Sequence, residues 1–179
     1  LPVMPLPKCM ASESLLTDII LQKFLYHMPF YRVIQKYKEL GVKISDSTMN
    51  DWYAAACEKL KLLYDILLRE VLSSDYIQVD ESTLPVIDNE KHRAVKGYMW
   101  CTRAVIEKLV AFYYDMGSRS YETARKLLRG YRGTIQTDGY DAYDQFESDP
   151  HIQVLNCWAH ARRKWVDALD EDKHTASEA

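Results

Sequence analysis

The sequence has little cysteine and no long apolar run, and both absences narrow the classes of protein that it can encode. The four cysteines form no C-x-x-C pair, which argues against a disulfide framework and predicts reduced thiols in a cytoplasmic protein. No stretch of about eighteen consecutive apolar residues occurs, so we predict no transmembrane helix. The first residues also lack the charged-then-apolar pattern of a secretory signal.

An excess of positive charge is also missing. The chain carries 23 lysines and arginines against 26 acidic residues, for a net charge of −3. This balance argues against a uniformly basic nucleic-acid-binding surface, although a local basic patch is compatible with it. Its 179 residues can form one good core and a small accessory domain, and a hydrophobic fraction of 47% is typical of a globular protein.

Three widespread catalytic motifs do not occur in the sequence. There is no Walker-type loop, no Gly-x-Ser-x-Gly elbow and no His-Glu-x-x-His run. Nucleotide hydrolysis by a P-loop, acyl transfer and zincin proteolysis are therefore poorly supported.

The first 75 residues have the periodicity of helices. Apolar residues recur at i, i+4 from Leu16, a second helix follows Pro29 and ends near Gly41, and a long third helix begins near Ser45. Two helices joined by this short turn resemble a helix-turn-helix, which would read DNA. A plain helical bundle whose turn contacts no DNA is at least as consistent with the pattern. We assign residues 1–75 to a helical accessory segment.

From Tyr76 onward the period changes to that of strands alternating with helices. We predict strands at 76–79, 97–105, 109–114, 134–137 and 152–156, and helices at 118–129, 141–147 and 158–169. Antiparallel hairpins followed by βαβ crossovers give a mixed five-stranded sheet flanked by helices. This is the α/β order of the ribonuclease H-like fold, which we assign to residues 76–179.

Two aspartates follow predicted strands of this sheet. Asp80 follows the first strand and Asp138 the fourth, and these strands are neighbours in the ribonuclease H topology. Their carboxylates can therefore meet at a common Mg²⁺ or Mn²⁺. Aspartate is also common at strand ends, and Asp138-Gly139 is a natural turn dipeptide, so a structural explanation is equally consistent. Because adjacent strand residues face opposite sides, we expect Glu81 to point away from the site.

The last predicted helix begins with a basic group that can contact phosphates. Its members are Arg162, Arg163 and Lys164, with His160 just before them. A solvated face with an Arg163–Asp167 i, i+4 pair is an equally good explanation. Cys157 and His160 have a C-x-x-H spacing, but a structural zinc site needs about four ligands and no second pair accompanies them.

Several of these motifs together resemble one family. The segments Val79–Thr83 with Gly97–Trp100, Thr137–Tyr143 and Cys157–Trp165 are similar, in order and spacing, to the IS66 family of bacterial insertion-sequence transposases. The upstream stretches His27–Arg32 and Ser47–Trp52 also match that family, so the resemblance covers nearly the whole chain.

The resemblance implies a DDE transposase core on a ribonuclease H-like fold. Asp80 takes the place of the first catalytic aspartate and Asp138 that of the second, with Mg²⁺ or Mn²⁺ as cofactor. The family's third acid is a Glu in an Asn-Asn-x-x-Glu-Arg context, and no such stretch occurs here. The chain is therefore expected to be a truncated central portion that is inactive by itself.

The implied reaction is hydrolysis of the phosphodiester at the ends of an insertion sequence, followed by attack of the freed 3′-hydroxyl on target DNA. One ion would activate the nucleophile and another would stabilise the leaving oxygen. DNA and further copies of the protein are the implied partners. Two alternatives remain: a non-catalytic DNA-binding or assembly module left by truncation, and a ribonuclease H-like metal nuclease that acts on RNA–DNA hybrids.

Overall fold

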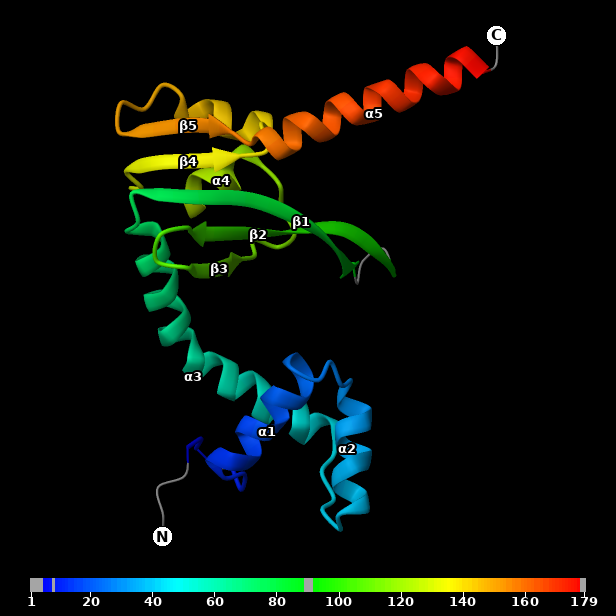
Figure 1. Cartoon of the computed structure of the whole chain (residues 1–179). Helices are drawn as coiled ribbons and strands as arrows, with labels where there is room; N and C mark the ends of the chain where they lie inside the picture. The colour runs from blue at the N-terminus through cyan, green and yellow to red at the C-terminus, as the bar shows by residue number, and fades with distance from the viewer. Residues whose placement is uncertain (1–4, 8, 89–91, 178–179) are drawn as a thin grey trace. The chain divides into compact units, whose positions relative to one another are not determined.

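The computed structural model describes residues 5–7, 9–88 and 92–177. Their chain folds as two compact units, Leu1–Tyr64 and Asp65–Ala179 (Figure 1). Among the described residues, no helix combines the length and the apolarity that a bilayer crossing requires.

The first unit contains helices α1 (Glu13–Phe24), α2 (Phe30–Glu39) and most of α3 (Asp46–Leu72). Their ends follow the capping chemistry of the sequence. Ser12 accepts a hydrogen bond from the Leu15 amide at the start of α1, and Ser45 does the same for the Thr48 amide at the start of α3. After α2, Gly41 adopts a φ of +83°, a left-handed conformation that costs little only for glycine.

A partly buried hydrogen bond between a tyrosine and a carboxylate lies beside the core of this helical unit. Ile19, Val33, Tyr37 and Met49 form a buried cluster between the three helices. The Tyr37 hydroxyl donates to Asp18 at 2.5 Å, and Lys36 lies 3.7 Å from the same carboxylate. The hydrogen bond from Tyr37 lowers the pKa of Asp18 below its ordinary value, although partial burial opposes the shift.

The second unit is built on a five-stranded mixed sheet with the order β3-β2-β1-β4-β5, visible from bottom to top in Figure 1. Its strands are β1 (Tyr76–Asp88), β2 (Arg93–Ala104), β3 (Leu109–Tyr113), β4 (Gly133–Thr137) and β5 (Ile152–Asn156). The β1–β2 and β2–β3 pairs are antiparallel, and the β1–β4 and β4–β5 pairs are parallel. The predicted ribonuclease H-like α/β fold, preceded by helices, is therefore confirmed.

Three helical elements connect or follow the later strands. They are α4 (Tyr121–Leu127), the 3₁₀ helix η1 (Asp141–Phe146) and α5 (Trp158–Ser177). α4 packs against the sheet beside β1 and β4, and Ser120 caps its start by accepting from the Thr123 amide (Figure 1). Buried apolar side chains of β1, β2 and β4, such as Ile77, Trp100 and Ile135, share one core with those of α4 and η1.

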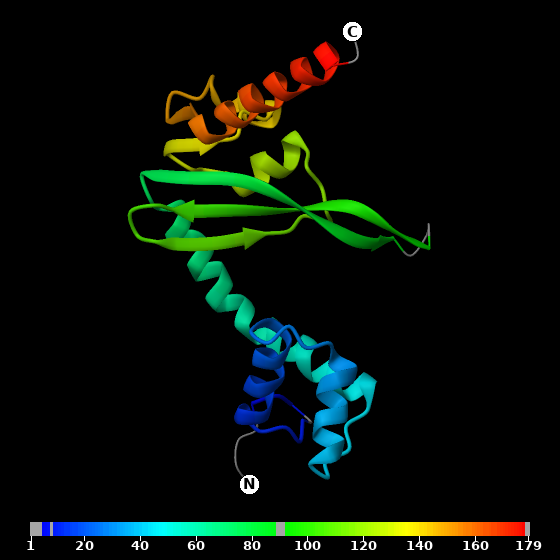
Figure 2. The ribbon, with the colours of Figure 1, turned by 45° about the vertical axis from the view of Figure 1, so that its right-hand side comes forward.

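β1 is longer than the sequence predicts. The predicted strand ends at residue 79, whereas β1 continues to Asp88 because β2 pairs with it from Ile77 to Asp88 (Figure 2). The parallel pairing with β4 is short and ends at Gln78. Asp80 therefore lies just beyond the last β1–β4 pair and not at the end of its strand. α5 is also longer than the predicted helix 158–169.

Candidate active site

Three carboxylates of the second unit converge beyond the end of β4. Asp80, Glu81 and Asp138 each offer one oxygen, and these oxygens lie within 4.8 Å of one another. The strand register explains the meeting of the two aspartates. Gln78 pairs with Gln136, and continuing this parallel register by two residues places Asp80 level with Asp138. The structure thus brings together the two aspartates that the sequence singles out.

The expectation that Glu81 points away from the site is wrong. Glu81 does leave β1 on the face opposite Asp80, since its side chain is fully buried whereas Asp80 is exposed. However, β4 does not pair with β1 beyond Gln78, so the β4-side edge of β1 is open at Asp80 and Glu81, while β2 still pairs with both residues. The longer Glu81 side chain therefore brings its carboxylate into the same group as the two aspartates.

The buried Glu81 carboxylate has partners on both oxygens. The Tyr143 hydroxyl donates to Oε1, and the Nε and Nη2 groups of Arg119 donate to Oε2 at 3.2 and 3.1 Å. Burial raises the pKa of Glu81, while the hydrogen bond from Tyr143 and the charge of Arg119 oppose that rise. Burial and the Glu81 charge also raise the pKa of Tyr143. The phenol therefore stays protonated and keeps donating to Glu81.

Arg119 joins Glu81 to Asp138. Its Nη2 lies 3.5 Å from Asp138 Oδ2, and its guanidinium stacks on the Tyr140 ring at 3.7 Å from the ring centroid. Tyr140 makes two hydrogen bonds in this network. Its hydroxyl donates to the Arg119 carbonyl at 2.8 Å, and its amide donates to Asp138 Oδ1 at 3.0 Å. Partial burial lowers the pKa of Arg119, but the nearby Glu81 and Asp138 carboxylates outweigh it and raise the pKa overall.

Sequence reasoning missed Arg119, Tyr140 and Tyr143. The sequence predicts a helix from residue 118, whereas the structure places Arg119 in the loop before α4, and the tyrosines resemble ordinary core residues in sequence. One signal could have pointed to Arg119: a glutamate on the apolar face of a strand needs a counter-ion when it is buried.

A small cavity of about 170 Å³ opens beside the two aspartates. It is lined by Gln78, Val79, Asp80, Gln136, Thr137, Asp138, Cys157 and His160. The Cys157 amide donates to the Thr137 carbonyl at 2.8 Å, which ties the start of α5 to the end of β4. His160 Nδ1 is buried and has no hydrogen-bond partner among the described residues. The C-x-x-H pair therefore borders the aspartates, but among described residues only Asp80, Glu81 and Asp138 form a metal-compatible group.

The basic residues of α5 do not line this cavity. Arg162, Arg163 and Lys164 are all exposed on the helix, whereas His160 faces the cavity from its first turn. The apolar side chains of the same helix are exposed as well: Trp158 is 86% exposed and Trp165 is 74% exposed.

The donor set fits a hard divalent cation. Carboxylate oxygens are the ligands that Mg²⁺ prefers, at about 2.1 Å, so two oxygens on one ion lie at most about 4.2 Å apart. The oxygens of the three carboxylates lie within 4.8 Å of one another, so small side-chain rotations bring them into range. The Glu81 side chain is fully buried and bound by Tyr143 and Arg119, whereas that of Asp138 is 22% exposed and Asp80 is exposed, so the two aspartates are the more accessible ligands.

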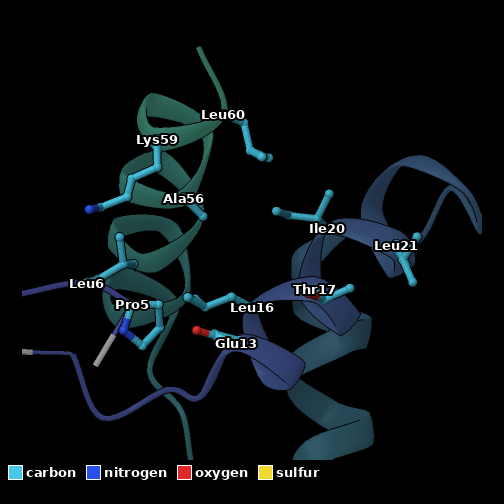
Figure 3. Close-up of a pocket in the computed structure, with 10 residues that line it drawn as sticks. All are labelled: Pro5, Leu6, Glu13, Leu16, Thr17, Ile20, Leu21, Ala56, Lys59 and Leu60. Carbon is cyan, nitrogen blue, oxygen red and sulfur yellow. The ribbon is translucent and has the colours of Figure 1, made fainter. Parts of the chain in front are cut away.

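The helical unit has a hollow of a different kind, with a volume of about 340 Å³ (Figure 3). Side chains from the N-terminal segment, α1 and α3 line it: Pro5, Leu6, Glu13, Leu16, Thr17, Ile20, Leu21, Ala56, Lys59 and Leu60. Glu13 and Lys59 are the charged groups of this lining, and no convergent set of carboxylates lies in it. We therefore place no chemistry there.

Comparison with known proteins gives one family. The sequence profile described as "Transposase IS66 family" matches residues 8–179. Uncharacterized protein y4qI of Sinorhizobium fredii (strain NBRC 101917 / NGR234) is 30% identical over 170 residues, which cover 87% of this chain and 31% of that protein. Uncharacterized protein y4jD of the same organism is 32% identical over 174 residues, covering 89% and 34%. The chain thus spans about a third of the length of these relatives.

Proposed function

The chain belongs to the IS66 transposase family, and from this premise we propose that it carries the first two acidic residues of a DDE transposase site. In the whole protein, that site would hydrolyse phosphodiesters at insertion-sequence ends and transfer the strands to target DNA. One observation carries the proposal: the Asp80 and Asp138 carboxylates come within 4.8 Å of each other beside a cavity.

Asp80 and Asp138 would hold Mg²⁺ or Mn²⁺. When bound, such an ion supplies Lewis-acid stabilisation of the charge that develops on phosphate and alcohol oxygens. The protein's own groups orient the ligands, because the Tyr140 amide and Arg119 fix the two oxygens of Asp138. Asp80 is exposed, and the Glu81 amide donates a hydrogen bond to its Oδ1. An ion can therefore reach the other oxygen of this carboxylate from solvent.

DNA is the proposed partner, and we assign its contacts to two places. His160 faces the cavity, where it can donate a hydrogen bond to a substrate phosphate. Arg162, Arg163 and Lys164 lie exposed on the following turn and can contact the backbone of the same DNA. The helical unit would bind DNA or a second copy of the protein. A cytoplasmic location is part of the same proposal.

We expect the 179-residue chain to bind metal weakly and to cleave no DNA. It contains no Asn-Asn-x-x-Glu-Arg stretch for the third acid, and it spans about a third of its relatives. The complete transposase that contains this sequence is therefore the protein in which cleavage should be measured.

The test compares Asp80→Asn, Asp138→Asn and the control Asp144→Asn, which changes an exposed aspartate of η1. In the complete transposase with Mn²⁺ and labelled element-end DNA, the first two variants should lose cleavage and keep DNA binding. The control should cleave as the wild type does. Cleavage by both active-site variants would place the chemistry elsewhere.

The two alternative functions give different outcomes in the same assay. A non-catalytic DNA-binding module would bind the labelled DNA and leave it intact with Mn²⁺ in every variant. A metal nuclease of the ribonuclease H kind would cut an RNA–DNA hybrid in preference to the element-end duplex.

A further inference from the structure

Arg119 offsets one of the three negative charges of the site. Three carboxylates converge, and the guanidinium of Arg119 lies within hydrogen-bond reach of two of them. Its contacts are unequal, since two N–H groups bind Glu81 at 3.1 and 3.2 Å and one lies 3.5 Å from Asp138. Arg119 is therefore primarily the partner of Glu81 and secondarily that of Asp138.

Glu81 is saturated by these contacts. Its side chain is 0% exposed, Tyr143 donates to one oxygen and Arg119 donates twice to the other. An ion could bind Glu81 only after breaking such a bond inside the protein, where an unpaired charge is costly. Glu81 and Arg119 thus form a neutral pair beside Asp80 and Asp138.

Arg119 is also fixed by contacts with aromatic residues. The Tyr140 ring stacks on its guanidinium, and the Tyr140 hydroxyl binds its main-chain carbonyl. A second aromatic ring, that of Tyr98, lies 5.3 Å from the guanidinium. The cation is therefore fixed at this position by contacts that do not involve the two aspartates.

We propose that Arg119 is a positioning residue that sets the metal affinity of the site. Paired with Glu81, it steadies the Asp138 carboxylate and leaves Asp80 and Asp138 as the two negative charges that one divalent cation neutralises. The inference rests on the proposed function, because it assumes that the two aspartates bind a metal. It goes further by assigning to Glu81 and Arg119 a joint electrostatic role without direct metal contact.

The proposal predicts effects of opposite sign for two neutralising substitutions. Arg119→Gln leaves Glu81 without its cation, so the site gains one negative charge and Mn²⁺ should bind about tenfold more tightly. Glu81→Gln leaves Arg119 to pair with Asp138 alone, so Mn²⁺ should bind about tenfold more weakly. The double variant restores the charge balance, and its affinity should lie near that of the wild type.

The experiment titrates the 179-residue chain and its variants with MnCl₂ and follows free Mn²⁺ by electron paramagnetic resonance. Circular dichroism monitors folding, and Arg119→Lys, which keeps the charge, should keep most of the affinity. The differences should shrink in 0.5 M KCl, because salt screens them. If Arg119 only supported the fold, every substitution of Arg119 or Glu81 would weaken Mn²⁺ binding, and the loss would not depend on the salt concentration.

The outcomes separate the two ideas. A wild-type chain that takes up no Mn²⁺ overturns this inference, which requires the two aspartates of the chain to bind the ion. An Asp80→Asn variant that binds Mn²⁺ unchanged overturns the proposed function and this inference with it. Mn²⁺ binding that requires the aspartates but is unchanged or weaker in Arg119→Gln overturns the inference alone. If Arg119→Gln does not fold, Glu81→Gln decides: unchanged affinity overturns the inference, and a salt-sensitive loss supports it.

Discussion

The indole N–H of Trp100 donates to the main-chain carbonyl of Ser118 at 2.9 Å, and this bond ties the middle of β2 to the residue before Arg119. Trp100 is fully buried, and its ring makes an edge contact with Tyr143 at 6.1 Å between centroids. Because Tyr143 in turn donates to Glu81, one core side chain supports two partners of the buried carboxylate.

Trp100→Phe should therefore destabilise the chain by about 2–3 kcal/mol. The substitution leaves a cavity where the larger ring was and removes the hydrogen bond to the Ser118 carbonyl. Urea unfolding followed by circular dichroism measures the change. The matched control is Trp158→Phe at a position that is 86% exposed, where the expected change is within about 0.5 kcal/mol. Equal effects at the two positions would contradict this account of the core.

Gly133 begins β4 in a conformation that other residues rarely adopt. Its φ is +138°, and an added Cβ would lie 2.5 Å from the Asp75 carbonyl oxygen, which is main chain and cannot rotate away. Gly133→Ala should cost about 3 kcal/mol or more and weaken the start of the strand that leads to Asp138.

Gly130 is the comparison for this prediction. It also has a positive φ, +76°, but an added Cβ would meet nothing within 4 Å. Gly130→Ala should therefore cost only about 1 kcal/mol, the conformational penalty alone. If urea unfolding midpoints show that Gly130→Ala is the more destabilising change, the close approach of an added Cβ to the Asp75 carbonyl does not determine the cost at Gly133.

The sheet was predictable from sequence because its strands have strong local signals. The predicted strand 152–156 agrees with β5 at both ends, and the 134–137 prediction differs from β4 by one residue. The convergence of Asp80 and Asp138 followed from topology, since the first and fourth strands were expected to be neighbours. In the structure, Gln78 of β1 pairs with Gln136 of β4, and the two aspartates each lie two residues further along.

The remaining parts of the site depend on long-range geometry that a local pattern does not carry. Glu81 reaches the aspartates because β4 ends early, and the sequence of β1 does not encode the end of its neighbour. Arg119 is assigned a role only when Glu81 is known to be buried and paired with it. The length of β1 was underestimated because the polar residues after Asp80 resemble a strand end, although β2 pairs with them throughout.

Arg163→Ala should weaken DNA binding by the complete transposase without regard to sequence. Arg163 is exposed on α5, and phosphate contacts by arginine are independent of the base sequence. The salt dependence of the binding constant, measured by fluorescence anisotropy, should flatten by about one counterion. Arg93→Ala removes the same charge from the start of β2 and should leave that slope unchanged. An unchanged slope for Arg163→Ala would instead identify that face of α5 as simply solvated.

Tyr37→Phe should remove part of the acid sensitivity of the helical unit. The Tyr37 hydroxyl donates to Asp18 and is the largest cause of the lowered pKa of that carboxyl, ahead of the opposing effect of burial. A carboxyl with a lowered pKa in the folded state stabilises the fold above its unfolded pKa of about 3.9, and this contribution disappears as the pH falls through the folded pKa.

The wild-type chain should therefore lose stability between about pH 5 and pH 2, and Tyr37→Phe should lose less over the same interval. Near pH 6 the variant should be less stable by about 1 kcal/mol, a value that allows for the 40% exposure of the Asp18 side chain. Tyr31→Phe is the matched control on α2, because Tyr31 is 64% exposed and its hydroxyl accepts a hydrogen bond from its neighbour Arg32. Urea titrations at pH 6 and pH 3 give the difference in unfolding free energy between each of the two variants and the wild type at each pH. If Tyr37→Phe and wild type lose equal stability on acidification, the Asp18 carboxylate is not held by Tyr37, and its lowered pKa must come from Gln22 and Lys36 instead.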